Sequence, residues 1–508
     1  MRRSIAGVTV ADSLLRPSVR LKLYRYLPWL GVFALALAAR WAYTAQLPPD
    51  APLESVDAQG YQALALNLLQ GRGFTLNLAP PYVPDAIRTP LYPAFVVLVY
   101  ALSGPVAAHV ALAQGMIDAV TALVVVEVVR RLVGGGWPAW AAGVLYALNT
   151  TAWRFGNQLL TEIVLAAILT WLLLAFVRYA DGRRTPWLVA AGALSAAALL
   201  VKPNMLLLPA IVALAVGWLP PVRRQERGRR WLASLGPAVV VLAVTGVLVF
   251  PWLVRNRVVF GRWLFSHAFE DNLARVSAVA TIAHVQGENV APWTPRWEAL
   301  YSGLLLEAKA RYGDEFIGVP LTAAEADRTQ QQLAAVATQV ILAHPRDFAL
   351  AHLSGFVRSW VPQEHRFWYG WLAGRSWDSL RTQEGALGQT LARLRADGLG
   401  AALGYFWQAR FAGLPPLALA LWLGWLLAYA VSALLLIRGT WRWRRWPALL
   451  LFCWGTILYT TFLPGPIADI RFRVPVAPML IVLMALGVAQ RPLDRYRLDP
   501  QSATAELA

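Results

Sequence analysis

The chain has 508 residues, of which 58% are hydrophobic and only 15% are charged, whereas charged residues make up about 25% of an ordinary soluble protein. This composition excludes a soluble globular enzyme, because a soluble core cannot bury so much apolar surface, while a bilayer can. The formal net charge of +18 would suggest nucleic acid in a soluble protein. Here the arginines fall in short runs between apolar segments, which is the pattern of cytoplasmic membrane loops, and we expect no nucleic-acid partner.

The apolar segments predict an all-α, polytopic membrane protein with about ten transmembrane helices, within a range of nine to eleven. The first begins near Leu27 after a basic stretch and has no small-residue cleavage site behind it, so we expect it to stay in place. The expected spans are residues 27–46, 106–129, 137–155, 159–177, 187–201, 204–219, 231–253, 414–437, 446–463 and 474–489.

The basic clusters orient these spans. With ten spans, all six clusters fall on one side, which should be the cytoplasm. The clusters are residues 2–25, 130–131, 178–184, 223–230, 438–445 and 491–497. We therefore expect a protein of the plasma (inner) membrane with both termini cytoplasmic. The predicted parts are a cytoplasmic segment 1–26, a transmembrane module 27–253 with outer loop 47–105, an extracytoplasmic domain 254–413, C-terminal spans 414–489 and a cytoplasmic tail 490–508.

The first outer loop, 47–105, is expected to carry two helices that lie at the membrane interface. Residues 57–71 place an apolar stripe on one helix face, with Asp57 at the N-cap and glycines at the end. The stripe comprises Tyr61, Leu64, Ala65, Leu68 and Leu69. Residues 91–102 are apolar but too short to cross, so 90–104 is predicted to be a second interfacial helix.

The segment 254–413 is long enough to form a mainly helical outer domain, with amphipathic helices over 322–344 and 381–402. Four tryptophans are expected at the interface, where indoles are favoured. They are Trp360, Trp368, Trp371 and Trp377. Its histidines show no ligand spacing, and the single cysteine, Cys453, lies in an apolar run. We therefore assign no metal ligand and no cofactor, and divalent-metal dependence stays open.

Charged residues from distant parts of the chain converge on the outer face. They are Asp50, Glu54, Asp57, Arg88, Glu162, Lys202, Arg255, Arg257, Asp469, Arg471 and Arg473. Any one of them alone is explained as a solvated loop charge or an interfacial anchor. Glu162 and Lys202 need more explanation, because they adjoin apolar helices where an unpaired charge is costly. Asp118, inside the second span, is either functional or paired with a buried cation such as Arg154.

Several motifs together resemble bacterial GT-C membrane glycosyltransferases, most closely the protein O-mannosyltransferase-like family and the 4-amino-arabinose lipid A transferases. They run in the family's order over about residues 20–490. They are Asp57-Ala-Gln-Gly-Tyr61, Asn67 to Phe74, Arg88-Thr-Pro-Leu-Tyr-Pro-Ala-Phe95, Asn157 to Glu162, Leu200-Val-Lys-Pro203, Pro251 to Asn256 with Phe260-Gly261, His344-Pro345 and Arg471-Phe-Arg-Val-Pro475. Many relatives have two adjacent acids where this chain has Asp57-Ala58, so Asp50, Glu54 or Glu162 could supply the second acid.

The resemblance implies a transferase that uses a polyprenyl-phosphate-linked sugar from the outer leaflet and an acceptor outside the membrane, a lipid, a glycan or a protein. Asp57 would be the general base, and inversion at the anomeric carbon is expected. The donor phosphate would meet cations, and the interfacial helices would shape an acceptor or lipid groove. The implied phosphate ligands are Arg255, Lys202, Arg88, Arg471 and Arg473, and the groove residues are Tyr61 and Tyr92.

Two other functions compete with this one. A transporter or flippase of lipid-linked sugars is favoured only by Asp118, and no internal repeat is visible. A non-catalytic scaffold with 254–413 as its binding module leaves the outer carboxylates and cations unexplained. The identities of the sugar and the acceptor stay open.

Overall fold

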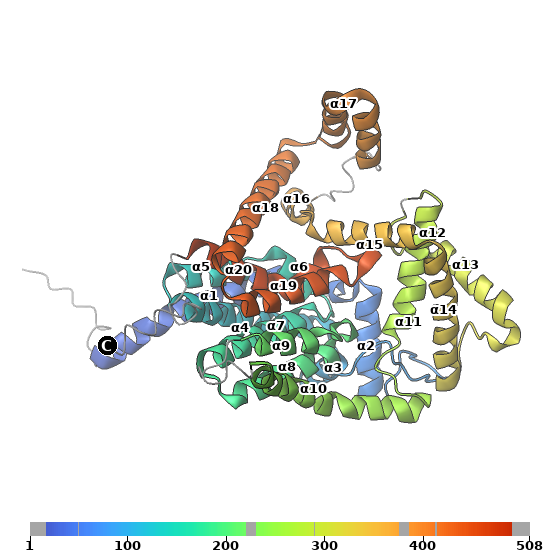
Figure 1. Cartoon of the computed structure of the whole chain (residues 1–508), viewed down its shortest axis with the longest axis horizontal. Helices are drawn as coiled ribbons and strands as arrows, with labels where there is room; N and C mark the ends of the chain where they lie inside the picture. The colour runs from blue at the N-terminus through green and yellow to red at the C-terminus, as the bar shows by residue number, and fades with distance from the viewer. Residues whose placement is uncertain are drawn as a thin grey trace, which may run out of the picture.

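The computed structural model describes residues 17–48, 50–219, 230–288, 290–374, 386–411 and 414–489. Every regular element in these ranges is a helix (Figure 1). Five stretches are long and apolar enough to cross a membrane, namely Ala107–Val133, Glu162–Gly182, Leu235–Phe260, Pro416–Arg442 and Ile470–Val488, and shorter apolar helices accompany them. The all-α polytopic class is thus confirmed, while the number of spans stays a prediction.

The apolar helices form one packed body. Its elements are α1 (Pro17–Thr44), α4 (Ala107–Val133), α5 (Trp137–Ala147), α6 (Thr150–Gly156), α7 (Glu162–Gly182), α8 (Thr185–Val201), α9 (Leu208–Gly217), α10 (Arg230–Phe260), α18 (Pro416–Arg442), α19 (Pro447–Phe462) and α20 (Ala477–Val488). Helix α20 contacts α4, α5 and α7, so the end of the chain returns to its first half.

Three expected spans differ in detail from the structure. The segment 137–155 is divided into α5 and α6, because Asn149 Oδ1 accepts a hydrogen bond from the Ala152 N–H at 3.1 Å and caps a new helix. Helix α10 continues past 253 to Phe260. The last span begins as a 3₁₀ helix, η9 (Ile470–Val476), before it becomes α20.

Close backbone contact fixes α20 against α18. A Cβ atom added at Gly439 would lie 2.1 Å from the Leu483 carbonyl oxygen, and one at Gly487 would lie 2.4 Å from that of Leu435. Small residues of this kind let membrane helices approach each other closely. The helix held in this way directly follows η9, which carries Arg471 and Arg473.

The first outer loop contains the two expected helices, α2 (Val56–Leu69) and α3 (Leu91–Ser103), which contact each other. Asp57 is not the N-cap of α2. The cap is Ser55, whose Oγ accepts a hydrogen bond from the Ala58 N–H at 3.2 Å, and Asp57 lies in the first turn with its carboxylate free for other partners. The interfacial position of both helices stays a prediction.

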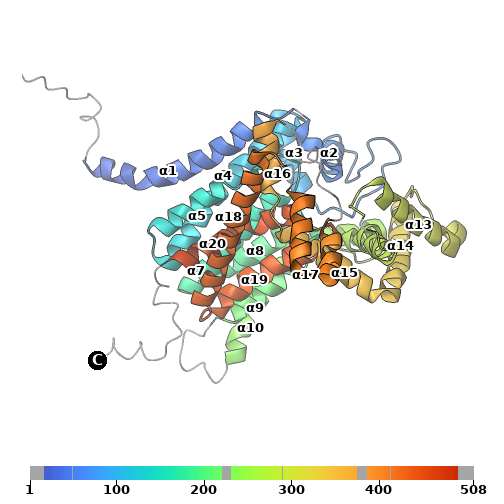
Figure 2. The same ribbon diagram turned by 90° about the horizontal axis from the view of Figure 1, so that it is seen from above.

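The outer segment forms its own hydrophobic core, in which Trp297, Val336 and Ala351 are buried together. Its elements are α11 (Ala268–Asn272), η5 (Leu273–Ala278), α12 (Val279–Val285), α13 (Pro295–Tyr312), α14 (Ala323–Ala343), α15 (Pro345–Trp360), α16 (Glu364–Ala373) and α17 (Ala386–Arg410). Helix α14 matches the predicted 322–344, whereas 381–385 and Trp377 lie outside the described residues. Figures 1 and 2 both place α2 between the apolar helices and α13 and α14.

Candidate active site

Five of the predicted residues come together around two carboxylates. Arg471 bridges them, with Nε 2.7 Å from Glu162 Oε1 and Nη2 3.0 Å from Asp57 Oδ2. Lys202 Nζ lies 2.8 Å from Glu162 Oε1, and Arg88 Nη2 lies 3.6 Å from Asp57 Oδ1. We call these five residues the Asp57 cluster. They come from α2, the loop before α3, α7, the C-cap of α8 and η9.

Glu162 is the buried centre of the cluster. Its side chain has no exposed surface, and a buried carboxylate is tolerable only when it is paired and hydrogen-bonded. Arg471 and Lys202 both donate to the same oxygen, Oε1. Helix polarity supports the arrangement, because Glu162 begins α7 and Lys202 caps the C-terminus of α8. This buried group therefore fixes the position of Arg471.

Asp57 is the accessible carboxylate of the cluster, with half of its side-chain surface exposed. Desolvation alone would raise the pKa of Asp57, but the Arg471 and Arg88 guanidinium groups outweigh it and hold that pKa below its ordinary value. Asp57 is therefore ionised at neutral pH and faces solvent. An ionised, oriented carboxylate of this kind can accept a proton from a substrate.

A glycine allows Arg88 to reach Asp57. A Cβ atom at Gly60 would lie 2.4 Å from Arg88 Nη2, so the guanidinium group rests directly on the backbone of α2. Arg88 Cζ lies 5.2 Å from the centre of the Tyr61 ring, and the backbone N–H of Arg88 donates to Asp85 Oδ2 at 3.0 Å. The sequence analysis assigned no role to Gly60. A glycine inside an otherwise helical pattern is a signal that another group packs closely against the helix at that point.

The two tyrosines assigned to a groove differ in accessibility. Tyr61 is 8% exposed, whereas Tyr92 has no exposed surface. The two rings meet edge to face at 4.6 Å. The Tyr92 hydroxyl donates to Gln114 Oε1 at 2.8 Å. Tyr92 thus supports Tyr61 from behind and does not line an accessible groove.

Arg255 lies beside the cluster. Its Nη1 donates to the Asp85 carbonyl oxygen at 3.0 Å and to Asn256 Oδ1 at 2.8 Å, and its guanidinium stacks over Trp252 at 4.9 Å. Arg255 therefore contacts the loop that carries Arg88, and the structure shows no direct pairing between Arg255 and Asp57.

Arg473 lies apart from the cluster, although only one residue separates it from Arg471. Its Nη2 lies 3.3 Å from Glu364 Oε1 of α16 and donates to the Tyr429 hydroxyl of α18. Tyr429 in turn donates to Glu364 Oε1 at 2.7 Å. These contacts tie η9 to two other helices and leave Arg473 engaged there.

The other acids proposed as a second carboxylate, Asp50 and Glu54, are exposed and have no ion pair among the described residues. Among the candidate acids of the site, Asp57 and Glu162 are joined through one cation, Arg471. The described residues contain no group of three or more His, Cys, Asp or Glu side chains placed to hold a metal ion.

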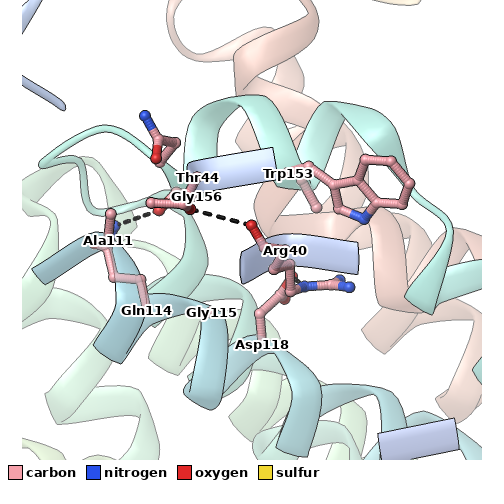
Figure 3. A pocket seen from close by; sticks show the side chains of 10 residues that line it. Arg40, Thr44, Ala111, Gln114, Gly115, Asp118, Trp153 and Gly156 are labelled. Atoms are coloured by element: carbon pink, nitrogen blue, oxygen red, sulfur yellow. Dashed lines mark hydrogen bonds and ion pairs between the residues drawn. The ribbon is translucent and has the colours of Figure 1, made fainter. Parts of the chain in front are cut away.

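Asp118 belongs to a different polar group inside the apolar body. Its partner is Arg40 of α1 rather than Arg154, and the Tyr146 hydroxyl also donates to it. Arg40 Nη1 donates further to the Ala147 carbonyl oxygen at 2.8 Å. Figure 3 shows Arg40 and Asp118 beside a small cavity between α1, α4 and α6, with about 10 Å³ of free space, room for roughly one water molecule.

Residues 87–254 match the family model for dolichyl-phosphate-mannose-protein mannosyltransferase. This segment contains Arg88, Glu162 and Lys202, whereas Asp57 and Arg471 lie outside it. No curated protein matches the chain.

Solved structures show a distant likeness. The archaeal oligosaccharyltransferase AglB from Archaeoglobus fulgidus, in complex with an inhibitory peptide and a dolichol-phosphate, aligns at 15% identity and a TM-score of 0.43, over 90% of this chain and 50% of that one. ArnT from Cupriavidus metallidurans bound to undecaprenyl phosphate aligns at 14% identity and a TM-score of 0.34, over 94% and 79%. The chain thus spans about half the length of the oligosaccharyltransferase. Through residues 87–254 the chain matches the dolichyl-phosphate-mannose-protein mannosyltransferase family, which confirms the resemblance to GT-C membrane glycosyltransferases.

Proposed function

We propose that the protein transfers a sugar from a polyprenyl-phosphate donor to a hydroxyl group of an extracytoplasmic acceptor, with Asp57 as the general base. The observation that carries this proposal is the Asp57 cluster. In it an accessible, ionised carboxylate is held between two arginines from distant parts of the chain. A carboxylate with a purely structural role would not need to be half exposed, so the exposure of Asp57 supports a role in binding or catalysis.

In the proposed reaction the acceptor oxygen attacks the anomeric carbon while its proton passes to a carboxylate oxygen of Asp57. The bond between that carbon and the donor phosphate oxygen breaks, and polyprenyl phosphate leaves. Attack from the face opposite the phosphate inverts the anomeric configuration. General-base assistance of this kind contributes roughly 10²- to 10⁴-fold to the rate.

The leaving phosphate gains negative charge, and the cluster is suited to stabilise it. Arg88, Lys202 and Arg471 face two carboxylates, which leaves an excess of one positive charge. Arg255 adds another beside the same loop. Arginine can bind phosphate oxygens through two parallel hydrogen bonds, and preorganised cations act where charge develops. We leave Arg473 out of this set, because Glu364 and Tyr429 already engage it.

The predicted topology determines the side of the membrane from which each substrate would reach the site. With the basic loops in the cytoplasm, the Asp57 cluster faces the other side of the plasma (inner) membrane. A lipid-linked donor would then approach from the outer leaflet, and the acceptor, a lipid, glycan or protein, from outside. The outer domain 254–413 would border the acceptor side.

The test uses purified protein in proteoliposomes, with radiolabelled polyprenyl-phosphate sugars and lipid, glycan and protein acceptors. Mass spectrometry of envelope lipids and glycans from a deletion strain identifies which sugar to supply. Asp57→Asn should abolish transfer, while Glu307→Gln, at an exposed acid of α13 outside the site, serves as the control and keeps it. Near-normal turnover by Asp57→Asn would refute the assignment of the base.

The flippase alternative loses its main support in the structure. Asp118, the one feature that favoured it, is neutralised by Arg40 within the apolar body. Movement of a labelled lipid-linked sugar across the bilayer without acceptor glycosylation would restore that alternative.

A further inference from the structure

The buried side-chain amide of Gln114 contacts two segments that lead to the partners of Asp57, namely α3 and the chain between α6 and α7. Gln114, on α4, has no exposed surface. Its Oε1 accepts a hydrogen bond from the Tyr92 hydroxyl at 2.8 Å, and its Nε2 donates to the Gly156 and Gln158 carbonyl oxygens, each at 2.8 Å (Figure 3 shows Gln114 joined to Gly156). A polar side chain in an apolar helix is costly unless its hydrogen bonds are made, and here both ends of the amide are engaged.

The oxygen end of this amide leads to Arg88. The Tyr92 ring packs edge to face on Tyr61 at 4.6 Å, and the Tyr61 ring lies 5.2 Å from Arg88 Cζ. Arg88 in turn lies 3.6 Å from Asp57. Because each of these contacts is direct, the position of the Tyr92 ring determines the position of the Tyr61 ring, and the Tyr61 ring determines where the Arg88 guanidinium can lie.

The nitrogen end leads to Arg471. Gly156 is the last residue of α6, Gln158 lies in the connection that follows it, and α7 begins at Glu162. This connection is also tied to the first outer loop, because the Leu159 N–H donates to the Pro52 carbonyl oxygen at 3.0 Å. Glu162 then fixes Arg471, which lies 3.0 Å from Asp57. Both routes from Gln114 therefore end at the same carboxylate.

We infer that Gln114 is a positioning residue for the base. By holding Tyr92 and the α6–α7 connection at a fixed spacing, it holds Arg88 and Arg471 against Asp57. The inference rests on the proposed function, in which Asp57 accepts the proton.

Loss of the Gln114 amide should change the pKa of Asp57, which a general loss of stability would not do. The groups that act on the Asp57 charge are Arg471 and Arg88, which favour it, and Glu162 and Asp271, which oppose it. If Arg88 withdraws, Asp57 loses one favourable partner and its pKa rises toward the ordinary value. A base must be ionised, so the acid limb of the pH–rate profile moves to higher pH.

The experiment compares Gln114→Met, which keeps the side-chain length and removes the amide, with Tyr92→Phe and with the double variant. Thr170→Val is the matched control, since Thr170 is fully buried on α7 and its hydroxyl, among the described residues, donates to the Ala166 carbonyl oxygen of the same helix. We expect Gln114→Met to lower kcat by roughly 10- to 100-fold, with little change in the KM for the donor. The acid limb should shift upward, and the effect of Tyr92→Phe should be less than additive with it.

A second measurement does not depend on activity. The infrared band of the Asp57 carboxyl group, identified by its absence from Asp57→Asn, is titrated in the wild type, Gln114→Met and Thr170→Val. The inference requires a higher Asp57 pKa in Gln114→Met and an unchanged one in Thr170→Val. An unchanged pKa in Gln114→Met overturns it, even if the wild type transfers sugar. A wild type that transfers no sugar overturns the proposed function, while the titration still decides the role of Gln114 in placing the arginines.

Discussion

Replacing Gly60 with alanine separates the function of the Asp57 cluster from the stability of the fold. The new Cβ would lie 2.4 Å from Arg88 Nη2 and 2.7 Å from Cζ. Non-bonded heavy atoms normally rest at about 3.5–4.0 Å. The guanidinium must therefore retreat by about 1 Å, and it is already 3.6 Å from Asp57. We expect this retreat to lengthen the contact with Asp57 beyond ion-pairing range.

The two expected effects have opposite signs. Glycine inside a helix is less favourable than alanine by roughly 0.5–1 kcal/mol, and the atoms displaced are the end of a flexible side chain, so Gly60→Ala should not destabilise the protein. A misplacement of about 1 Å at a reacting centre can reduce the rate by up to about 100-fold. We therefore expect an unchanged or higher melting temperature together with a kcat that falls by at least about 10-fold.

The assay is sugar transfer in proteoliposomes, paired with thermal unfolding followed by tryptophan fluorescence. Gly303→Ala is the matched control, because Gly303 lies on the exposed face of α13 and an added Cβ there meets nothing within 4 Å. It should gain the same helix stability and keep full activity. A Gly60→Ala variant with wild-type kcat would refute the placement of Arg88 as a functional contact.

Three further predictions follow from the paired charges. Because the pKa of Asp57 is lowered, its base form should persist as the pH falls to about 4, and a limb in the kcat/KM profile that depends on Asp57 with a midpoint above about pH 5 would contradict this. Glu162→Gln should leave Arg471 buried without a full counter-charge and cost roughly 3–5 kcal/mol in thermal unfolding; a wild-type melting temperature would contradict the pairing. Asp118→Asn should cost a similar amount, and adding Arg40→Met should recover part of it, because burying an unpaired charge is the main penalty; a larger loss in the double variant would argue against the pair.

The sequence predicted the fold class through composition and period. Apolar runs between arginine clusters identify helices in a bilayer, and the i, i+3, i+4 stripe around Tyr61 predicted α2 within two residues at either end. It did not place the caps. Ser55 rather than Asp57 caps α2, since either side chain suits a cap and only the backbone conformation decides between them.

The sequence also predicted the candidate residues of the site, from the order of the motifs and from the predicted outer face of the membrane. It did not predict which of these residues form ion pairs with one another. Arg471 and Arg473 are two positions apart in a 3₁₀ helix, where each residue advances by about 120°, so their side chains point in different directions. One meets Asp57 and Glu162, and the other meets Glu364 and Tyr429.

Local sequence by itself determined that this chain is helical and spans a membrane, because those properties depend on residue type and period, and it predicted that carboxylates and cations converge on one membrane face. Only the tertiary structure decided which charge meets which. That choice depends on close approaches such as Gly60 with Arg88 and Gly439 with Leu483, and on buried groups such as Gln114 and Glu162 that join segments far apart in the chain. Pairings of this kind are properties of packing, which no single segment contains.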